Sequence, residues 1–292
     1  MKTRPYIIVT PTYCVSAGVR VMHSLCHELN ALGLDARVLL TTDLSRGSGV
    51  FLNPALNTPN VNALMTENGP AWAALLEQAI VIYADGVQGN PLGAKRVVRY
   101  VLGKEMPKPT DDPSDFRIYY SRAFPVKREA HHRTLFLFPV DLGMFNDKGV
   151  VTRDQDMRWL GKGAKYCTEP EQNVVDITYS WPPTREELAA NLRRTRYLYS
   201  YDGLSCTNQE AILCGATVIV KHLSYHDWEW TRADLAAMEH GIGGYAFGDS
   251  DFEIDRAQRT RMEMVESLRY HVATFRQKLL DFVDESQQRF KP

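Results

Sequence analysis

The chain has 292 residues, 44% of them hydrophobic, which is enough for one or two domains with sizeable cores. Its formal net charge is −1, so no general attraction to nucleic acid or to an anionic membrane surface is expected. The five cysteines are odd in number and contain no C-x-x-C pair, which indicates reduced thiols and a cytoplasmic protein. No signal peptide and no membrane-spanning run of about 18 apolar residues is recognised. Any membrane contact is therefore expected to be peripheral, at the inner face.

The first part of the chain alternates strand and helix signals. A strand over residues 6–10 is followed by a helix over residues 19–32, whose apolar positions keep helical spacing. A second strand over residues 36–40 and a helix near residues 71–78 come next. The β-α-β order predicts a parallel sheet with a right-handed crossover. Gly18 then lies at the carboxyl end of the first strand, where open sheets bind ligands, although a tight turn alone also explains a glycine there.

A second polar loop follows the strand predicted over residues 79–83. The loop carries Asp85 and Asn90, and a helix is predicted over residues 91–102, opened by its proline. Asp85 and Asn90 would face the same crevice as Gly18 if their strands are neighbours. A turn at Asp85 and a cap at Asn90 explain these residues equally well.

The region that follows contains a proline-rich linker or lid and two further predicted strands. The linker covers residues 104–115, and the strands cover residues 116–120 and 134–138. His131 and His132 lie between these strands. Adjacent histidines do not converge on a metal ion as residues one helical turn apart do, so no metal site is predicted.

A second α/β unit is predicted to begin near residue 140. Its strand over residues 157–160 runs into a glycine-flanked turn, residues 161–163, which presents Lys162 and is followed by Lys165. Glycines let the backbone approach a diphosphate closely, and a lysine adds a mobile positive charge. Ordinary solvated turns also contain this pattern, so the ligand role is a hypothesis.

Two strands and a helix continue this unit. The strands are predicted over residues 174–179 and 196–200, and the helix between them begins at residue 184. Thr184 followed by Glu187 forms a capping box, which is a specific signal for a helix start.

The next stretch reads as a turn, a short helix and a strand. The turn is Asp202-Gly203, and the helix is entered through Ser205 and Thr207. A helix entered in this way points unpaired backbone N–H groups and the positive end of its dipole at the preceding loop. The sequence therefore predicts an anion site, bracketed by the carboxylates of Asp202 and Glu210.

The last part of the chain is predicted as one long helix over residues 256–290. Its apolar seam spans only about three heptads, which favours a helix packed on the body of the protein over a coiled coil. Before it, Trp228 and Trp230 are interpreted as core or hinge packing, with stacking on a ligand as the alternative.

Residues 185–220 resemble the C-terminal signature of GT-B glycosyltransferases, in particular the large retaining family 4. Members of that family carry two glutamates separated by seven residues, and Asp202 and Glu210 show this separation, with aspartate at the first position. Residues 17–20 resemble the family's G-G-x-x-R opening, and residues 161–163 resemble its donor-phosphate turn.

The resemblance implies an α/β fold of GT-B type, with two Rossmann-like domains facing across a cleft and a C-terminal helix that crosses back to the first domain. The expected acceptor-side domain covers residues 1–140 with about 270–292, and the nucleotide-sugar-binding domain covers residues 141–269.

The resemblance also implies roles for individual residues. Glu210 would hold the ribose hydroxyls, and Asp202 would hold the donor sugar. Contacts to the nucleotide-sugar are expected from Gly18, Lys162, Lys165, Asp202, Gly203, Ser205, Cys206, Thr207 and Glu210. The expected catalytic residues are Asp85, Asp202 and Lys162, with Asn90 on the acceptor side.

The implied activity is transfer of a sugar from a nucleoside diphosphate to a hydroxyl group, with retention and without a metal or other cofactor. The acceptor is expected to be a glycan or a lipid-linked acceptor in cell-surface polysaccharide synthesis, with no nucleic-acid partner. Two alternatives stay open: a nucleotide-sugar epimerase of GT-B fold, and a non-catalytic GT-B-like subunit that only binds a partner or glycan.

Overall fold

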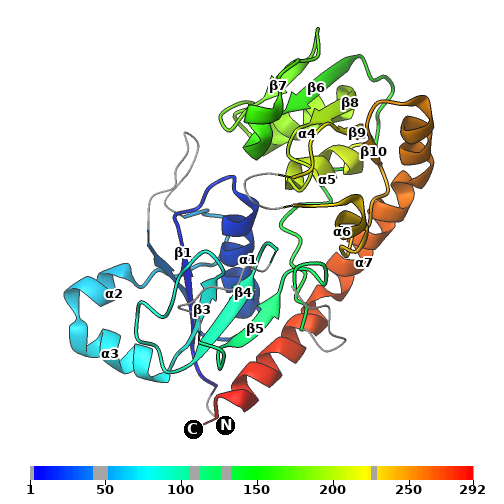
Figure 1. Cartoon of the computed structure of the whole chain (residues 1–292). Helices are drawn as coiled ribbons and strands as arrows, with labels where there is room; N and C mark the ends of the chain where they lie inside the picture. Colours follow the sequence, from blue (N-terminus) through cyan, green and yellow to red (C-terminus); the bar gives the residue numbers. More distant parts are fainter. Residues whose placement is uncertain (1–2, 42–51, 105–111, 126–132, 225–228, 292) are drawn as a thin grey trace. The chain divides into compact units, whose positions relative to one another are not determined.

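The computed structural model describes residues 3–41, 52–104, 112–125, 133–224 and 229–291 (Figure 1). The chain divides into two compact units, residues 1–139 with 272–292 and residues 140–271. His131 and His132 lie outside the described residues.

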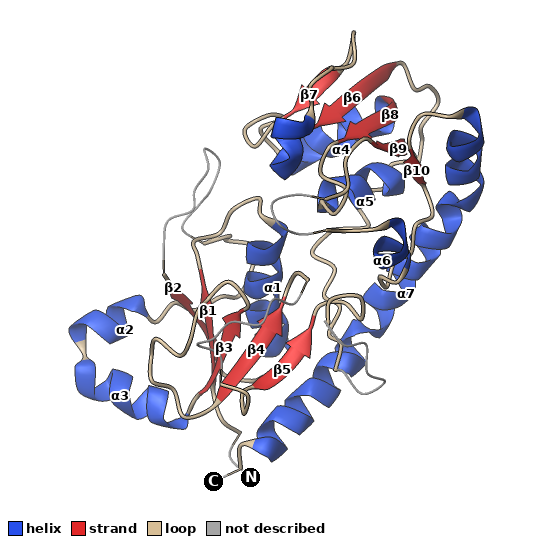
Figure 2. Ribbon diagram, in the orientation of Figure 1, coloured by secondary structure: helices blue, strands red, loops and turns tan. Residues whose placement is uncertain are grey.

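The first unit is built on a five-stranded parallel sheet. Its strand order is β2-β1-β3-β4-β5. The strands are β1 (Tyr6–Thr10), β2 (Ala36–Leu40), β3 (Ile80–Ala84), β4 (Val97–Val101) and β5 (Phe116–Tyr119). The helices that precede or follow them are α1 (Ala17–Ala31), α2 (Asn62–Glu67) and α3 (Gly69–Gln78) (Figure 2).

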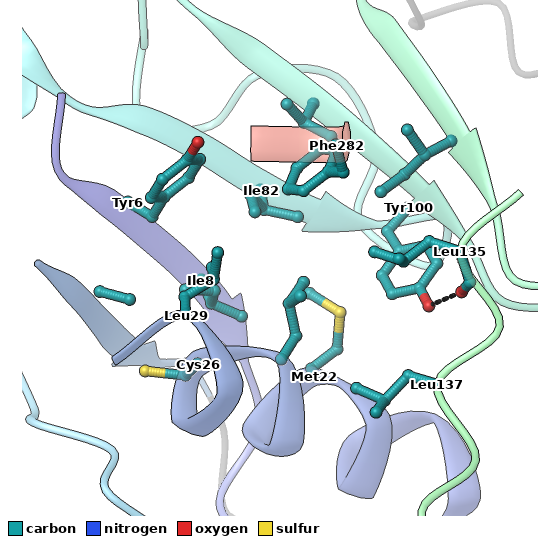
Figure 3. Packing of buried hydrophobic residues seen from close by; sticks show 14 of the residues in the cluster. Tyr6, Ile8, Met22, Cys26, Leu29, Ile82, Tyr100, Leu135, Leu137 and Phe282 are labelled. Atoms are coloured by element: carbon teal, nitrogen blue, oxygen red, sulfur yellow. Dashed lines mark hydrogen bonds between the residues drawn. The ribbon is translucent and has the colours of Figure 1, made fainter. Parts of the chain in front are cut away.

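Alternate residues of β1 divide between two hydrophobic clusters, because successive side chains of a strand point to opposite faces. Tyr6 and Ile8 belong to a cluster with Met22 of α1 and Phe282 of α7 (Figure 3). Ile7 belongs to the other cluster, against which α2 and α3 pack. Both faces of this sheet are therefore covered, as is typical of parallel sheets.

The long helix α7 (Asp251–Arg289) contributes to both units, because the division between them falls at residues 271 and 272. Phe282 is fully buried, with the rings of Tyr6 and Phe116 at centroid distances of 6.2 and 6.3 Å. The Tyr6 hydroxyl and the Ser286 hydroxyl are 2.8 Å apart and form a buried hydrogen bond. The last turns of α7 are thus fixed to the first strand.

Replacing Tyr6 by phenylalanine is expected to lower the free energy of unfolding by about 1 kcal/mol, because Ser286 loses a buried hydrogen-bond partner while ring packing is kept. Urea unfolding of both proteins measures the difference. Tyr270→Phe, at a side chain that is 61% exposed, is the matched control and should have no effect. Equal stability of Tyr6→Phe and wild type would contradict the prediction.

The second unit contains another five-stranded parallel sheet, with the order β10-β9-β8-β6-β7. The strands are β6 (Gln155–Trp159), β7 (Val175–Ile177), β8 (Thr195–Ser200), β9 (Thr217–Val220) and β10 (Tyr245–Phe247). The helices are α4 (Arg185–Arg194), α5 (Cys206–Leu213), α6 (Arg232–Ala236), the first part of α7 and the short 3₁₀ helix η1 (Gly161–Tyr166).

The predicted α/β class with two parallel, Rossmann-like sheets is confirmed, but two predicted elements are wrong. Residues 97–101 form β4 rather than part of a helix. This strand lies between β3 and β5 and all five of its residues are buried, so it lacks the polar–apolar alternation that would have identified it. Residues 134–138 do not form a strand, because only Thr134 makes an isolated bridge, to Tyr119. Among the described residues, no helix is long and apolar enough to cross a membrane.

Candidate functional site

The second sheet has a topological switch point between β6 and β8. The chain passes from β6 to its neighbour β7 on one side, and then returns to β8 on the other side of β6. In open parallel sheets, ligands bind outside the carboxyl ends of the strands at such a point. Two segments lie there: η1, which follows β6, and residues 201–205, which connect β8 to α5.

The turn at the start of η1 packs so closely on the β8–α5 connection that two of its positions require glycine. A Cβ atom on Gly161, whose φ is +48°, would lie 2.4 Å from Oδ2 of Asp202 and 2.8 Å from Nε1 of Trp159. A Cβ atom on Gly163 would lie 1.7 Å from the carbonyl oxygen of Tyr201. These glycines hold Lys162, whose side chain is exposed, at the carboxyl end of β6.

Asp202 joins the turn to the start of α5. Its side chain is only 5% exposed, and Oδ2 accepts a hydrogen bond of 3.1 Å from the backbone N–H of Lys162. Its carbonyl oxygen accepts hydrogen bonds from the Asn208 side chain and the Ser205 N–H, at 2.9 and 3.1 Å. Burial raises the pKa of Asp202, and the N–H and charge of Lys162 oppose this rise. Asp202 thus positions Lys162 as well as presenting a carboxylate at the switch point.

This geometry predicts opposite effects for two substitutions of Asp202. Asparagine can still accept the Lys162 N–H bond without burying a charge, so Asp202→Asn should be at least as stable as wild type at pH 7. Alanine removes the acceptor, so Asp202→Ala should lose about 1–2 kcal/mol.

The pH dependence of unfolding provides a check. Because the folded-state pKa of Asp202 is above 3.8, folding disfavours the ionised carboxyl group. The contribution of Asp202 to the free energy of unfolding therefore falls as pH rises from 3.8 through the folded-state pKa. Asp202→Asn should lack this decline. An asparagine variant less stable than the alanine variant would contradict the prediction.

The N-terminus of α5 lies at the same switch point. The Ser205 hydroxyl accepts a hydrogen bond of 3.3 Å from the Thr207 N–H, and the first turn contains no acidic residue. Ser205, Cys206 and Thr207 are half-buried, and a Cβ atom on Gly203 would lie 2.6 Å from Cδ1 of Leu223, which would have to move. The backbone N–H groups and dipole of this helix end favour an anion such as a phosphate.

A hydrogen-bond network of three buried residues, Gln209, His240 and Tyr245, holds the buried face of α5. The Gln209 side-chain amide lies 3.1 Å from the Tyr245 hydroxyl and 3.3 Å from Nε2 of His240. The other ring nitrogen of His240 lies 2.7 Å from the carbonyl oxygen of Gly241, to which it donates. The position of α5 is therefore set by a polar network rather than by apolar packing alone.

The far end of α5 is held by two arginines. Arg153 donates to the carbonyl oxygen of Cys214 at 2.9 Å, and Arg261 donates to that of Ile212 at 3.0 Å. Guanidinium groups at a helix C-terminus satisfy its last carbonyl groups and complement the dipole.

Glu210, predicted to bind ribose, is only 1% exposed and forms an ion pair with Arg185. The Arg185 guanidinium group lies 4.5 Å above the ring of Phe145, and its side chain is 35% exposed. A ligand that reaches Glu210 must therefore displace Arg185 or bind beside it. No local sequence pattern identifies this pair, because its members are 25 residues apart.

The remaining predicted residues occupy different surroundings. Lys165 is exposed, with its ammonium group 4.9 Å from the centre of the Tyr166 ring. Trp230 is 5% exposed, as the packing interpretation predicts, and Trp228 lies outside the described residues. Over the described ranges, no cluster of three or more His, Cys, Asp or Glu residues is arranged to hold a metal ion.

Three predicted residues belong to the first unit, whose switch point lies between β1 and β3. Gly18 is in the first turn of α1, and Asp85 follows β3, so both lie at this point. One Asp85 carboxylate oxygen accepts a hydrogen bond of 3.2 Å from the Leu102 N–H. Asn90 closes its own loop, because its side-chain oxygen accepts bonds from Tyr83 and Ala94 at 3.0 and 2.9 Å.

No family model and no curated protein matches the chain. Three solved structures align with 97% of it: an alpha-glucosyltransferase in complex with UDP and a 13-mer DNA, the spinosyn rhamnosyltransferase SpnG with spinosyn aglycone, and the glycosyltransferase VinC with DTDP. The identities are 12, 14 and 11%, the TM-scores are 0.47, 0.41 and 0.43, and 95, 96 and 100% of those chains are covered. Because these identities and TM-scores are low, the description of the fold rests on the strands and helices of the chain itself.

Proposed function

We propose that the chain is a glycosyltransferase that moves a sugar from a nucleoside-diphosphate sugar to a hydroxyl acceptor. One observation carries the proposal: Lys162 and the N-terminus of α5 lie together at the switch point of the second sheet. A mobile cation and a set of backbone N–H groups at this place suit a diphosphate. The resemblance of residues 185–220 to GT-B glycosyltransferases supports the view that this diphosphate belongs to a nucleotide-sugar.

In the proposed reaction, the bond between the anomeric carbon and the diphosphate oxygen breaks, and a bond to the acceptor oxygen forms on the same face. The acceptor proton passes to the departing phosphate oxygen, so no protein nucleophile is needed. Lys162 and the α5 N–H groups stabilise the negative charge that develops on the diphosphate, which removes the need for a metal. Asp202 keeps Lys162 in place through its hydrogen bond and contributes a hydrogen-bond acceptor toward the sugar.

The finer assignments rest on the sequence resemblance. They are a retaining reaction of the family 4 type and a glycan or lipid-linked acceptor in polysaccharide synthesis. The proposed cytoplasmic location rests instead on the five cysteines, interpreted as reduced thiols, and any membrane contact is proposed to be peripheral. Asp85 and Gly18 are the acceptor-side and phosphate-side candidates of the first unit, where Asp85 directly follows β3 and Gly18 lies in the first turn of α1, the helix after β1.

A thermal-shift panel of UDP, GDP, ADP and CMP tests the proposal. A ligand present at about a hundred times its Kd stabilises the folded protein by about 2.7 kcal/mol, which raises the melting temperature by several degrees. One nucleoside diphosphate is expected to produce this shift in wild type and a smaller one in Lys162→Ala. If none of the four nucleotides shifts the melting temperature, the proposal is wrong.

The burial of Glu210 under Arg185 favours one rival, a GT-B-like subunit that binds without turnover. Nucleotide binding without sugar transfer to any acceptor, unchanged in Lys162→Ala, would support that rival. The epimerase alternative is recognised by rearranged sugar when nucleotide-sugars are incubated without an acceptor.

A further inference from the structure

We propose that two copies of this chain associate through one exposed face of α7, with the two helices antiparallel and the two-fold axis passing Met262. The face lies in the part of α7 that belongs to the second unit (Figure 1). Its residues, which we call the α7 stripe, are Phe252, Asp255, Arg259, Met262, Glu266, Arg269 and Tyr270.

The residues of the α7 stripe share one face because the first six follow one another at spacings of three and four positions. Such spacing places side chains on the same side of a helix. All seven are exposed, and the opposite side of α7 supplies the buried residues Ala257, Met264 and Leu268. The α7 stripe is therefore the side of the helix that faces solvent.

Three large side chains of the stripe expose apolar surface. Phe252, Met262 and Tyr270 are 71, 42 and 61% exposed. In an antiparallel pair centred on Met262, the two Met262 side chains meet, and Phe252 of each copy lies near Tyr270 of the other. Association would thus bury apolar surface at three places, which is favourable. Because single exposed apolar residues are common, the choice of a second copy as the partner rests on the charges.

The charges of the α7 stripe are complementary to those of a second copy in this arrangement. With Met262 opposite Met262, Asp255 lies opposite Arg269 of the other copy, and Arg259 lies beside Glu266. The two-fold axis makes each contact occur twice, as in any isologous interface.

Neighbouring arrangements bring like charges together. If one helix slides by four residues, Arg259 lies opposite Arg269. If it slides by three residues the other way, Asp255 lies opposite Glu266. A parallel pair in register would place each charge against the same charge of the other copy. Because like charges across an interface are costly, the charge pattern selects the antiparallel pair centred on Met262.

These charges are available to a partner. Asp255 and Arg259 form an exposed ion pair of 2.8 Å within the helix. Glu266 and Arg269 are exposed and form no ion pair with any residue that the structure describes. In the dimer, the Asp255–Arg259 pair of one copy faces Arg269 and Glu266 of the other, so each positive group has a negative neighbour.

Sedimentation equilibrium of wild type up to roughly 200 µM is expected to show a monomer–dimer equilibrium with a Kd on the order of 10 µM, because one helix pair buries less than the standard interface of about 1,600 Å². Asp255→Arg and Arg269→Asp each place like charges opposite one another, so each should weaken the dimer by at least about tenfold.

An equimolar mixture of these two variants supplies the matched control. In the mixed dimer, the native Arg269 of one variant faces the native Asp255 of the other, and the two reversed residues face each other. The mixture should therefore associate about as tightly as wild type. Mixing leaves each helix as it was, so recovery cannot come from the Asp255–Arg259 pair within one helix.

Cysteine crosslinking locates the two-fold axis. Met262→Cys places two thiols opposite one another, so mild oxidation should join two copies through a disulfide. Tyr270→Cys is on the same face but lies opposite position 254, which sets its two thiols about 24 Å apart along the helix. It should crosslink no more than wild type, whose native cysteines give the background.

Three results overturn the proposal: wild type that stays monomeric at roughly 200 µM, a mixture that associates no better than the single variants, or equal crosslinking of Met262→Cys and Tyr270→Cys. A monomeric wild type would leave the α7 stripe to a different partner. None of these measurements involves a nucleotide, so this proposal and the proposed function can fail separately.

Discussion

Replacing Lys162 by alanine is expected to lower kcat/KM for sugar transfer about a hundredfold, which is the effect of removing one preorganised group that stabilises a developing negative charge. The side chain of Lys162 is exposed, and the turn is held by its backbone N–H bond to Asp202 and by the packing of Gly161 and Gly163. The free energy of unfolding should therefore change by less than about 0.5 kcal/mol. Steady-state kinetics and urea unfolding of the same preparations separate the two effects.

Lys165 supplies the matched control. Lys165→Ala removes the same charge from the same 3₁₀ helix, but from a side chain that lies over the Tyr166 ring. Its effect on kcat/KM should be no more than about threefold, because its ammonium group lies over the Tyr166 ring and an exposed charge is screened by solvent and salt. Equal losses in the two variants would show that the general charge of the turn, rather than the position of Lys162, governs the reaction.

The site elements of the second unit were predictable because their signals are local. Thr184 caps α4 and accepts the Glu187 N–H at 3.2 Å, which is one of the two bonds of the predicted capping box. The helix predicted after Asp202-Gly203 begins at Cys206, one residue after its cap Ser205. Turn and capping residues act over two or three positions, so one sequence contains the whole interaction.

The contacts that decide the chemistry of the site were not predictable. One oxygen of Asp202 accepts the N–H of a residue 40 positions away, and no local pattern predicts this bond. The ion pair of Glu210 with Arg185 is likewise absent from any local pattern. The first contact arises where β6 lies beside β8, and the second arises from the packing of α4 on α5. Both depend on how the whole sheet is assembled. The short strand β10, with three residues, was also missed, because three residues are too few to show a clear alternation.

Acidification from pH 6.5 to pH 4 is expected to lower the free energy of unfolding through His240 by up to about 3 kcal/mol. Burial lowers the pKa of His240 from 6.5 to about 4, because the charged ring has no access to water. The backbone carbonyl of Gly241 partly opposes this shift, and the nearby His271 adds to it. The folded state therefore prefers the neutral ring. The stabilising contribution of this ring to the free energy of unfolding is fully present above pH 6.5 and is lost as pH falls toward 4.

Comparison with His240→Gln isolates this titration from that of the other groups. Glutamine does not ionise, so the difference in unfolding free energy between wild type and variant should be constant above pH 6.5 and should shrink below it. Parallel curves down to pH 4 would contradict the assignment.

Protonation of His240 also affects its contact with Gln209. The Gln209 amide donates a hydrogen bond to Nε2 of the neutral ring, but a protonated Nε2 is itself a donor and can no longer accept this bond. Because Gln209 precedes Glu210 in α5, loss of this bond is expected to loosen the helix that we propose binds the diphosphate. Nucleotide affinity should then fall over the same pH range in wild type, and more steeply than in His240→Gln.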